Sequence, residues 1–263
     1  MNPPESPTWA PRLAVITGAC GGMGAALAAD LDARGWATLR VDVVAEDRVP
    51  DTGFAQPTAY VRADVADEDD MARLRAVVAD GAAERDAFLG IAAAGVISAG
   101  RTESLSRAEW ERIIRVNLTG TFATLQSLIP AARAASTGRL IAIASDAGKT
   151  GEAWLPHYSA SKFGVIGLVQ ALALELVEEG ITVNAICPSI VDTPMMQQLA
   201  EQMSRATGDG DADEWRRRFV DEVPAGRACR PEDVAFAVNM LAQPGSAFIT
   251  GQSINVSGGK EKH

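Results

Sequence analysis

Short apolar runs recur along the chain, and few polar residues interrupt them. They occupy residues 13–17, 37–41, 59–63, 88–94, 139–145, 181–187 and 253–256. A strand covered on both faces of a parallel sheet has this continuous apolar pattern, whereas a half-exposed strand alternates polar and apolar side chains. The pattern therefore predicts about seven buried strands.

Longer stretches between the runs have the spacing of amphipathic helices. They cover about 22–34, 67–80, a stretch that begins at Ser106, 153–179 and 231–242. Ser106 and Glu109 form an S-x-x-E capping box, and Pro231 suits a first helical position. Strands that alternate with helices predict an α/β fold, a Rossmann-type doubly wound parallel sheet with helices on both faces. We expect one domain over residues 12–259.

The two ends and one long connection fall outside this regular pattern. Residues 1–11 are rich in proline and are predicted to form a flexible lead-in, and residues 260–263 a tail. The connection over 188–230 contains the polar stretch TGDGDADE. Loops of this length in a compact domain are usually functional or mobile. We therefore interpret residues 188–230 as a substrate lid.

Composition and charge narrow the class of protein. The 263-residue chain has a formal net charge of -10, which argues against nucleic acid or an anionic membrane as a partner. Its three cysteines form no disulfide framework or metal-ligand pattern, and two histidines cannot form a metal cluster. No apolar run reaches the length of a membrane span, and the first residues lack the features of a secretory signal. We expect a cytoplasmic protein without a metal.

A glycine-rich turn follows the first predicted strand. Residues 17–24 read TGACGGMG and lead directly into the first predicted helix. Glycines at this place permit a tight turn and let the backbone approach a pyrophosphate at the helix N-terminus. Because the turn opens a strand–helix–strand unit, it predicts a dinucleotide-binding site.

An acidic residue at the end of the second strand bears on the choice of cofactor. Asp42 follows Gly24 by eighteen residues, where a carboxylate can accept hydrogen bonds from the hydroxyls of an adenosine ribose. It would repel the 2′-phosphate of NADP, and no lysine or arginine lies within 17–24 to attract that phosphate. We therefore predict NAD in preference to NADP. A loop-edge carboxylate without a cofactor role is the alternative, and the nearby Arg40 and Arg48 count against the preference for NAD.

Four polar residues follow in a regular order. Asn117 lies in RVNLTG, Ser145 ends the strand RLIAIAS, and Tyr158 and Lys162 lie in HYSASKFG. Because Tyr158 and Lys162 are four residues apart, they share one face of the predicted helix. Each residue taken alone has a plain structural interpretation, but the ordered set favours a catalytic site.

Together with TGxxxGxG, CPSIVDTPM at 187–195 and ITGQSINVSGG near the end, this set resembles the short-chain dehydrogenase/reductase family. The resemblance covers nearly the whole chain. It implies that Asn117, Ser145, Tyr158 and Lys162 form the catalytic tetrad of an NAD(P)-dependent oxidoreductase that acts on secondary alcohols.

The resemblance also implies contacts with the cofactor. Asp64 matches the family's adenine contact, and Thr193 matches the residue that holds the nicotinamide carboxamide. The cofactor-binding residues that we predict are Gly18, Gly22, Met23, Gly24, Asp42, Asp64, Val65, Ala94, Gly95, Tyr158, Lys162, Pro188, Val191 and Thr193. This chain departs from the family twice, because Asn-Asn-Ala-Gly is replaced by residues 92–95, AAAG, and Pro-Gly by Pro188-Ser189.

The residue types fit hydride transfer from an alcohol. Oxidation needs a base for the hydroxyl proton, and the ordinary tyrosine pKa of about 10 is too high for a base at neutral pH. A nearby ammonium favours the phenolate, so we expect Lys162 to lower the pKa of Tyr158. Ser145 can hydrogen-bond the reacting oxygen, and Asn117 can anchor a water that relays protons.

The substrate side is expected to be partly apolar. Trp154, Met195 and Met196 are predicted to form its wall, with Ser145 and Lys149 as polar contacts. The resemblance implies a polyol, a sugar-derived hydroxy compound or another secondary alcohol as substrate. A 3-oxoacyl thioester (acyl-carrier-protein) reductase is the alternative enzyme, and a catalytically silent NAD-binding regulator or scaffold is the alternative of a different class.

A stripe of small residues follows Tyr158 along its helix. Ala160, Gly164, Gly167 and Ala171 permit close approach of another helix or subunit. The resemblance favours a homotetramer with this helix and the last strand at its interfaces, and a dimer is the alternative.

Overall fold

The computed structural model describes residues 11–49, 53–80 and 85–263, so the predicted lead-in falls almost wholly outside the described residues. Within them, seven parallel strands form one sheet in the order β3-β2-β1-β4-β5-β6-β7. The strands are β1 Arg12–Thr17, β2 Ala37–Asp42, β3 Thr58–Arg62, β4 Ala87–Ala92, β5 Gly138–Ile143, β6 Thr182–Pro188 and β7 Ser253–Val256. The predicted doubly wound parallel sheet is confirmed.

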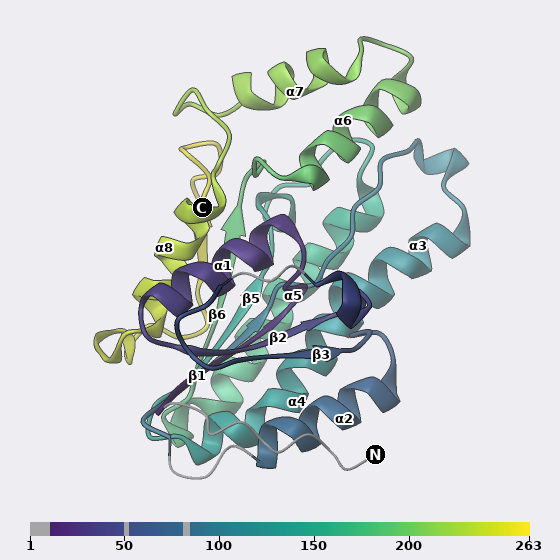
Figure 1. Cartoon of the computed structure of the whole chain (residues 1–263). Helices are drawn as coiled ribbons and strands as arrows, with labels where there is room; N and C mark the ends of the chain where they lie inside the picture. The colour runs from purple at the N-terminus through teal and green to yellow at the C-terminus, as the bar shows by residue number, and fades with distance from the viewer. Residues whose placement is uncertain (1–10, 50–52, 81–84) are drawn as a thin grey trace.

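Helices cover both faces of the sheet (Figure 1). They are α1 Gly22–Ala33, α2 Glu68–Asp80, α3 Arg107–Ile114, α4 Gly120–Ala134, α5 Pro156–Leu176, α6 Pro194–Thr207, α7 Ala212–Asp221 and α8 Pro231–Ala242. One core cluster joins the sheet to α2, α4 and α5 through side chains such as Leu74, Leu128 and Val165. A second cluster joins the other face to α1 and α8 through Leu27 and Val238. Burial on both faces explains the continuous apolar runs.

The order of the strands reverses beside β1. From β1 the chain proceeds outward to β2 and β3, and it then crosses back so that β4 pairs with the other side of β1. In open α/β sheets the ligand crevice lies outside the carboxyl ends of the strands at such a switch point. The turn after β1 and the chain after β4 therefore face the same crevice.

The connection over 188–230 is largely helical, which corrects its interpretation as a loop. It contains α6 and α7, which project beyond the sheet (Figure 1). Met196, Leu199 and Met203 form the buried stripe of α6, and Gly208 ends the helix with a left-handed backbone conformation. The polar stretch is only the joint between the two helices, where the Asp211 side chain accepts a hydrogen bond from the Glu214 amide at 2.8 Å. Because this stretch is strongly polar, the sequence indicates a loop over the whole connection and obscures the helical spacing on either side.

Two further details refine the predicted helices. The hydroxyl of Ser106 accepts the amide of Glu109 at 3.1 Å, but the Glu109 carboxylate binds Arg112 rather than completing the capping box. Residues Pro156–Glu179 are long and apolar enough to cross a membrane by length and composition. In the structure their helix packs Val165 and Val169 into the core against the sheet, so it is a core helix with one uncovered face.

Candidate active site

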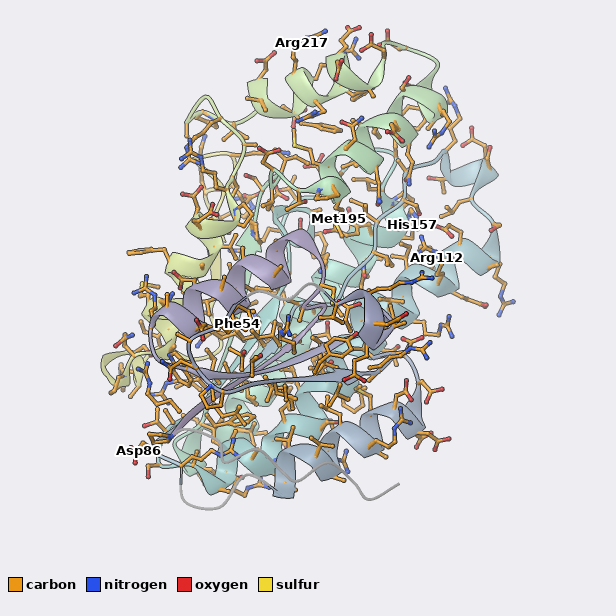
Figure 2. The ribbon with its side chains drawn as sticks, in the orientation of Figure 1. Phe54, Asp86, Arg112, His157, Met195 and Arg217 are labelled. Carbon is orange, nitrogen blue, oxygen red and sulfur yellow. The ribbon has the colours of Figure 1, made fainter. Side chains whose placement is uncertain are left out.

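One cavity extends along the carboxyl ends of the strands, with a volume of about 990 Å³. It runs from the glycine turn after β1 to the helices α6 and α7. Met195 of α6 and Arg112 of α3 both line it, and both are labelled in Figure 2. Its volume lies at the upper end of the range for ligand pockets.

The cavity gathers most of the predicted site residues. All fourteen predicted cofactor-binding residues line it, together with Ser145, Trp154, Met195 and Met196. Asn117 and Lys149 lie outside its lining. The Lys149 ammonium instead donates to the carbonyls of Ser253 and His263, at 2.7 and 2.8 Å, so its position does not support the predicted contact with substrate.

The glycine turn is packed too tightly for side chains. Gly18 has a φ of +70°, and a Cβ there would lie 2.7 Å from the Ala94 Cα. A Cβ on Gly24 would lie 2.1 Å from the Gly18 carbonyl oxygen. These two glycines therefore let the turn close against both β4 and the start of α1.

The N-terminus of α1 fits a pyrophosphate. In the described structure no side chain caps this helix, and its first turn carries no acidic residue. The first amides of a helix lack partners within the helix and carry the positive end of its dipole. An uncapped terminus that faces a cavity is thus suited to an anion, as a dinucleotide requires.

Backbone amides hold the Asp42 carboxylate at the edge of the cavity, beside the glycine turn. Its Oδ2 accepts the amide of Cys20 at 2.8 Å, and its Oδ1 accepts the amide of Val44 at 3.3 Å. Tyr60 supports the same segment, because its hydroxyl donates to the carbonyls of Asp42 and Val44. The carboxylate joins the glycine turn to the end of β2 and still lines the cavity.

Asn117 lies in a break between helices. A π-helical turn, Arg115–Thr119, joins α3 to α4, and such turns are frequent at functional sites. The buried Asn117 amide exchanges two hydrogen bonds with the Val96 backbone, at 2.8 and 2.9 Å, and donates to Ser161 Oγ at 3.2 Å. It therefore ties the chain after β4 to α5, and its part in a water relay stays a prediction.

Ser145, Tyr158 and Lys162 meet at the middle of the cavity. Lys162 Nζ lies 5.7 Å from the centroid of the Tyr158 ring and donates to the carbonyl of Ile143 at 2.8 Å. Ser145 follows β5, while Tyr158 and Lys162 occupy successive turns of α5. The helical spacing of four residues thus places the two side chains on one face, as predicted.

Burial dominates the electrostatics of this group. It raises the pKa of Tyr158 to about 12, an effect that hydrogen bonding with Ser145 opposes and the charge of Asp146 reinforces. Burial also lowers the pKa of Lys162 to about 8. The expected lowering of the Tyr158 pKa by Lys162 is therefore absent from the protein alone, because desolvation of the phenolate outweighs it.

The two departures from the family pattern are accommodated locally. The amides of Ala93 and Ala94 donate to the hydroxyl of Thr17, at 3.3 and 3.5 Å, so β1 braces the chain after β4. Ser189 is buried at the cavity, and its hydroxyl has no hydrogen-bond partner among the described residues.

The outer wall of the cavity is mainly apolar. Leu155, Leu199 and Met203 form a small buried cluster, against which Trp154 and Trp215 pack. Trp154 has a φ of 68°, the left-handed region that a bulky residue seldom adopts. Such strain is maintained only where the surroundings impose it, and it clusters at ligand sites.

Several lining residues had no signal in the sequence. Asp146, Glu222 and Lys260 reach the cavity from three distant segments. The predicted tail thus contributes Lys260 to the cavity wall. Charged residues of this kind resemble ordinary surface residues until the fold brings them together.

Comparison with known proteins supports the fold and identifies the family. The family model described as "short chain dehydrogenase" matches residues 12–204. A Streptomyces coelicolor protein named "Putative ketoacyl reductase" is 37% identical over 256 residues, covering 94% of this chain and 96% of that protein. The "(3R)-3-hydroxyacyl-CoA dehydrogenase" of Rattus norvegicus is 34% identical and covers 94% of this chain and 95% of its own. The solved structure of a single-residue variant of actinorhodin polyketide ketoreductase with NADPH superposes with a TM-score of 0.85 at 31% identity, covering 96% of this chain and 98% of that one.

Proposed function

The chain belongs to the short-chain dehydrogenase family of oxidoreductases, which act on hydroxyl and keto groups, and from this premise we propose that it transfers hydride between NAD(H) and a secondary alcohol or ketone. One observation carries the proposal. Ser145, Tyr158 and Lys162 line the same cavity as the glycine turn and Asp42. A reacting carbon can therefore approach both a bound dinucleotide and the tyrosine hydroxyl.

The residues present fit the cofactor from end to end. Asp42 would accept hydrogen bonds from the adenosine ribose, and the amides at the start of α1 would hold the pyrophosphate. Lys162 would reach the nicotinamide ribose, and Thr193 would hold the carboxamide. When bound, NAD accepts the hydride in oxidation and NADH donates it in reduction.

Tyr158 is the acid or base of the proposed reaction. In reduction its hydroxyl gives a proton to the oxygen of the new alcohol, and in oxidation the phenolate removes that proton. A raised pKa keeps the hydroxyl protonated at neutral pH, so the protein by itself is prepared for reduction. Lys162 still carries its proton at neutral pH, because its pKa is about 8, and supplies positive charge beside the phenolate. Ser145 positions the reacting oxygen against the tyrosine.

The apolar wall favours a substrate with an apolar body. Met195, Met203 and Trp215 line the outer part of the cavity, and methionine adapts to irregular shapes. Within the secondary alcohols expected from the sequence, this wall favours an apolar alcohol or ketone over a polyol.

A ketoacyl thioester reductase is the second candidate. The named relatives favour it, since they include a ketoacyl reductase and a hydroxyacyl-CoA dehydrogenase. The acidic Asp42 favours NAD, whereas the ketoreductase structure was determined with NADPH. The two candidates therefore differ in cofactor as well as in substrate.

A substrate panel tests both candidates and the non-enzymatic alternative. We would follow NADH and NADPH absorbance with secondary alcohols, polyols, cyclic ketones and 3-oxoacyl thioesters. Turnover of an apolar alcohol with NAD supports the first candidate, and reduction of a thioester with NADPH supports the second. Tight NADH binding with no turnover across the panel would instead indicate a regulator or scaffold.

Asp42→Asn is expected to weaken the preference for NAD. We expect the wild type to have a higher kcat/KM with NAD than with NADP. The ratio of the two kcat/KM values should be about tenfold lower in the variant, because the substitution removes the charge that repels a 2′-phosphate. Asparagine keeps an oxygen that can accept the Cys20 amide, so the turn stays in place. Asp47→Asn, at an exposed position nearby, is the matched control and should keep the wild-type ratio. An NADP-preferring wild type would contradict the proposal.

Two uncovered apolar faces favour a homo-oligomer. Phe163 and Leu174 are exposed on α5, at 46% and 80%, and Phe236 and Phe248 are exposed on the opposite side of the sheet, at α8 and after it. Two different self-complementary faces on one chain generate a closed tetramer with dihedral symmetry. We therefore propose a tetramer that uses both faces.

Charged substitutions should separate the two interfaces. Leu174→Glu is expected to convert the tetramer into a dimer, and so is Phe236→Glu, because each places a charge in an apolar contact. Sedimentation velocity measures the change. Val77→Glu, on the partly exposed face of α2, is the control and should leave the mass unchanged. A wild type that sediments as a monomer would rule out the proposed assembly.

A further inference from the structure

Four charged side chains from three segments of the chain meet on the cavity wall. The ammonium of Lys260 lies 2.9 Å from Glu152, 3.0 Å from Glu222 and 3.5 Å from Asp146. Glu222 directly follows α7, and Asp146 directly follows Ser145. All four side chains line the cavity. Lys260 thus links the helical lid to the residue beside the proposed catalytic serine.

The segment that carries Lys260 is held in place by its own contacts. The Ser257 hydroxyl accepts the Glu261 amide and donates to the Glu261 carbonyl, both at 3.1 Å. The Glu261 carboxylate accepts the Thr150 hydroxyl at 2.7 Å, and Lys149 donates to the His263 carbonyl. These contacts fix the position from which Lys260 enters the wall.

Asp146 needs this positive charge. It is only 7% exposed, and its Oδ1 accepts the Ser145 hydroxyl at 2.9 Å and the Ala147 amide at 2.8 Å. Its Oδ2 is buried and has no hydrogen-bond partner among the described residues. The Lys260 ammonium is the cation beside that oxygen. A buried carboxylate with an open oxygen is costly unless a counter-charge accompanies it.

The carboxylate in turn controls the Ser145 hydroxyl. A hydroxyl has one proton, which Ser145 gives to Asp146, and two lone pairs, one of which accepts the Ala147 amide at 3.2 Å. The second lone pair is left for a hydrogen-bond donor in the cavity, such as a substrate hydroxyl. Asp146 therefore presents Ser145 to the cavity as an acceptor, which suits the hydroxyl of an alcohol substrate in the oxidation direction.

We propose that Lys260 is a positioning residue, whose ammonium balances the charge of Asp146 and so holds the Ser145 hydroxyl in its orientation beside Tyr158. This inference rests on the proposed function of that site. Neither Lys260 nor Asp146 has to touch the reacting atoms. Their effect reaches the reaction through the orientation of Ser145 and through the field at Tyr158.

The direction of the effect on pH dependence follows from the charges. Together with burial, the negative charge of Asp146 raises the pKa of Tyr158. Burial raises the pKa of Asp146 itself, and the positive charge of Lys260 opposes that rise. We expect the same positive charge to offset the field of Asp146 at Tyr158. Loss of the ammonium should make the phenolate harder to form, and loss of the carboxylate should make it easier. The other titratable groups that interact with Asp146 are Glu152, Cys187 and Cys229.

Four variants test the proposal through the pH profile of kcat/KM for alcohol oxidation. Lys260→Met should move the alkaline rise to higher pH by about one unit, and Asp146→Asn should move it to lower pH. The double variant should return close to the wild-type profile, because both charges are gone. Lys262→Met removes a positive charge from an exposed neighbour and should leave the profile unchanged.

A second measurement does not depend on turnover. The chain has two tyrosines, so in a Tyr60→Phe background the tyrosinate absorbance titrates Tyr158 alone. Lys260→Met should raise its midpoint and Asp146→Asn should lower it, with circular dichroism confirming that each variant is folded. If no substrate is found but these midpoints move, the proposed function fails and the coupling stands. Equal midpoints, or a Lys260→Met variant that loses activity equally at every pH, would show that Lys260 only anchors the chain and would overturn the proposal.

Discussion

Tyr158→Phe is expected to lower kcat by about 10³-fold or more, in either direction of the reaction, while NADH binds with unchanged affinity. The substitution removes the hydroxyl that we propose as the proton donor and acceptor for the reacting oxygen, and it keeps the ring. Tyr158 lines the cavity between Ser145 and Lys162, and phenylalanine fills nearly the same volume. Stopped-flow or steady-state kinetics measures kcat, and NADH fluorescence measures the dissociation constant.

The other tyrosine provides the matched control for this substitution. Tyr60→Phe removes a hydroxyl that donates to the carbonyls of Asp42 and Val44, at the adenosine end of the site. It should change the KM for the cofactor at most and leave kcat at saturating cofactor unaltered. A Tyr158→Phe variant that retains more than about a tenth of wild-type kcat would exclude Tyr158 as the acid or base.

Gly24→Ala is expected to weaken NADH binding by about 100-fold, because displacement of a binding element by an ångström has an effect of this size. The added Cβ would lie 2.1 Å from the Gly18 carbonyl oxygen and 2.8 Å from the Ala19 Cα. Both are backbone atoms, so the turn has to move rather than a flexible side chain. The start of α1 would then shift away from the pyrophosphate. Isothermal titration with NADH measures the loss.

Gly21→Ala is the graded control in the same turn. Gly21 has a φ of -72°, which any residue adopts, and a Cβ there would lie 3.3 Å from the Gly18 carbonyl oxygen. We expect its effect on NADH affinity to be several times smaller than that of Gly24→Ala. Equal losses for both variants, with circular dichroism unchanged, would show that the close packing of Gly24 is not what shapes the turn.

The strands were predictable because burial on both faces of the sheet requires a continuous run of apolar residues. Residues 139–145 and 181–187 are apolar almost without interruption, and β5 and β6 are buried along their whole length. The glycine turn was predictable for a similar reason, since a Cβ on Gly24 would meet the Gly18 carbonyl oxygen within the same turn. The close approach of Gly18 to Ala94, by contrast, depends on the tertiary structure. The fold class and the glycine turn after β1 therefore followed largely from short stretches of sequence.

The structure of the connection over 188–230 was harder to predict, because its apolar and polar stretches indicate different structures. The apolar stripe of α6 is helical, but the polar joint before α7 dominates the composition of the connection. The sequence predicted a lowered pKa for Tyr158, whereas burial raises it in the protein alone. The spacing along the helix indicates a neighbouring lysine but not how deeply the tyrosine is buried. Lys149, which seemed well placed along the chain, turns instead to the carbonyls of Ser253 and His263.

By itself, the sequence determined the parallel α/β sheet, the glycine turn and the pairing of Tyr158 with Lys162, because each depends on residues close together in the chain. Only the tertiary structure decided that Lys260 stands beside Asp146, and how Ser145 is oriented between Asp146 and the cavity. Lys260 and Asp146 lie far apart in the sequence. No local sequence pattern around a charged residue predicts which distant residue it will contact.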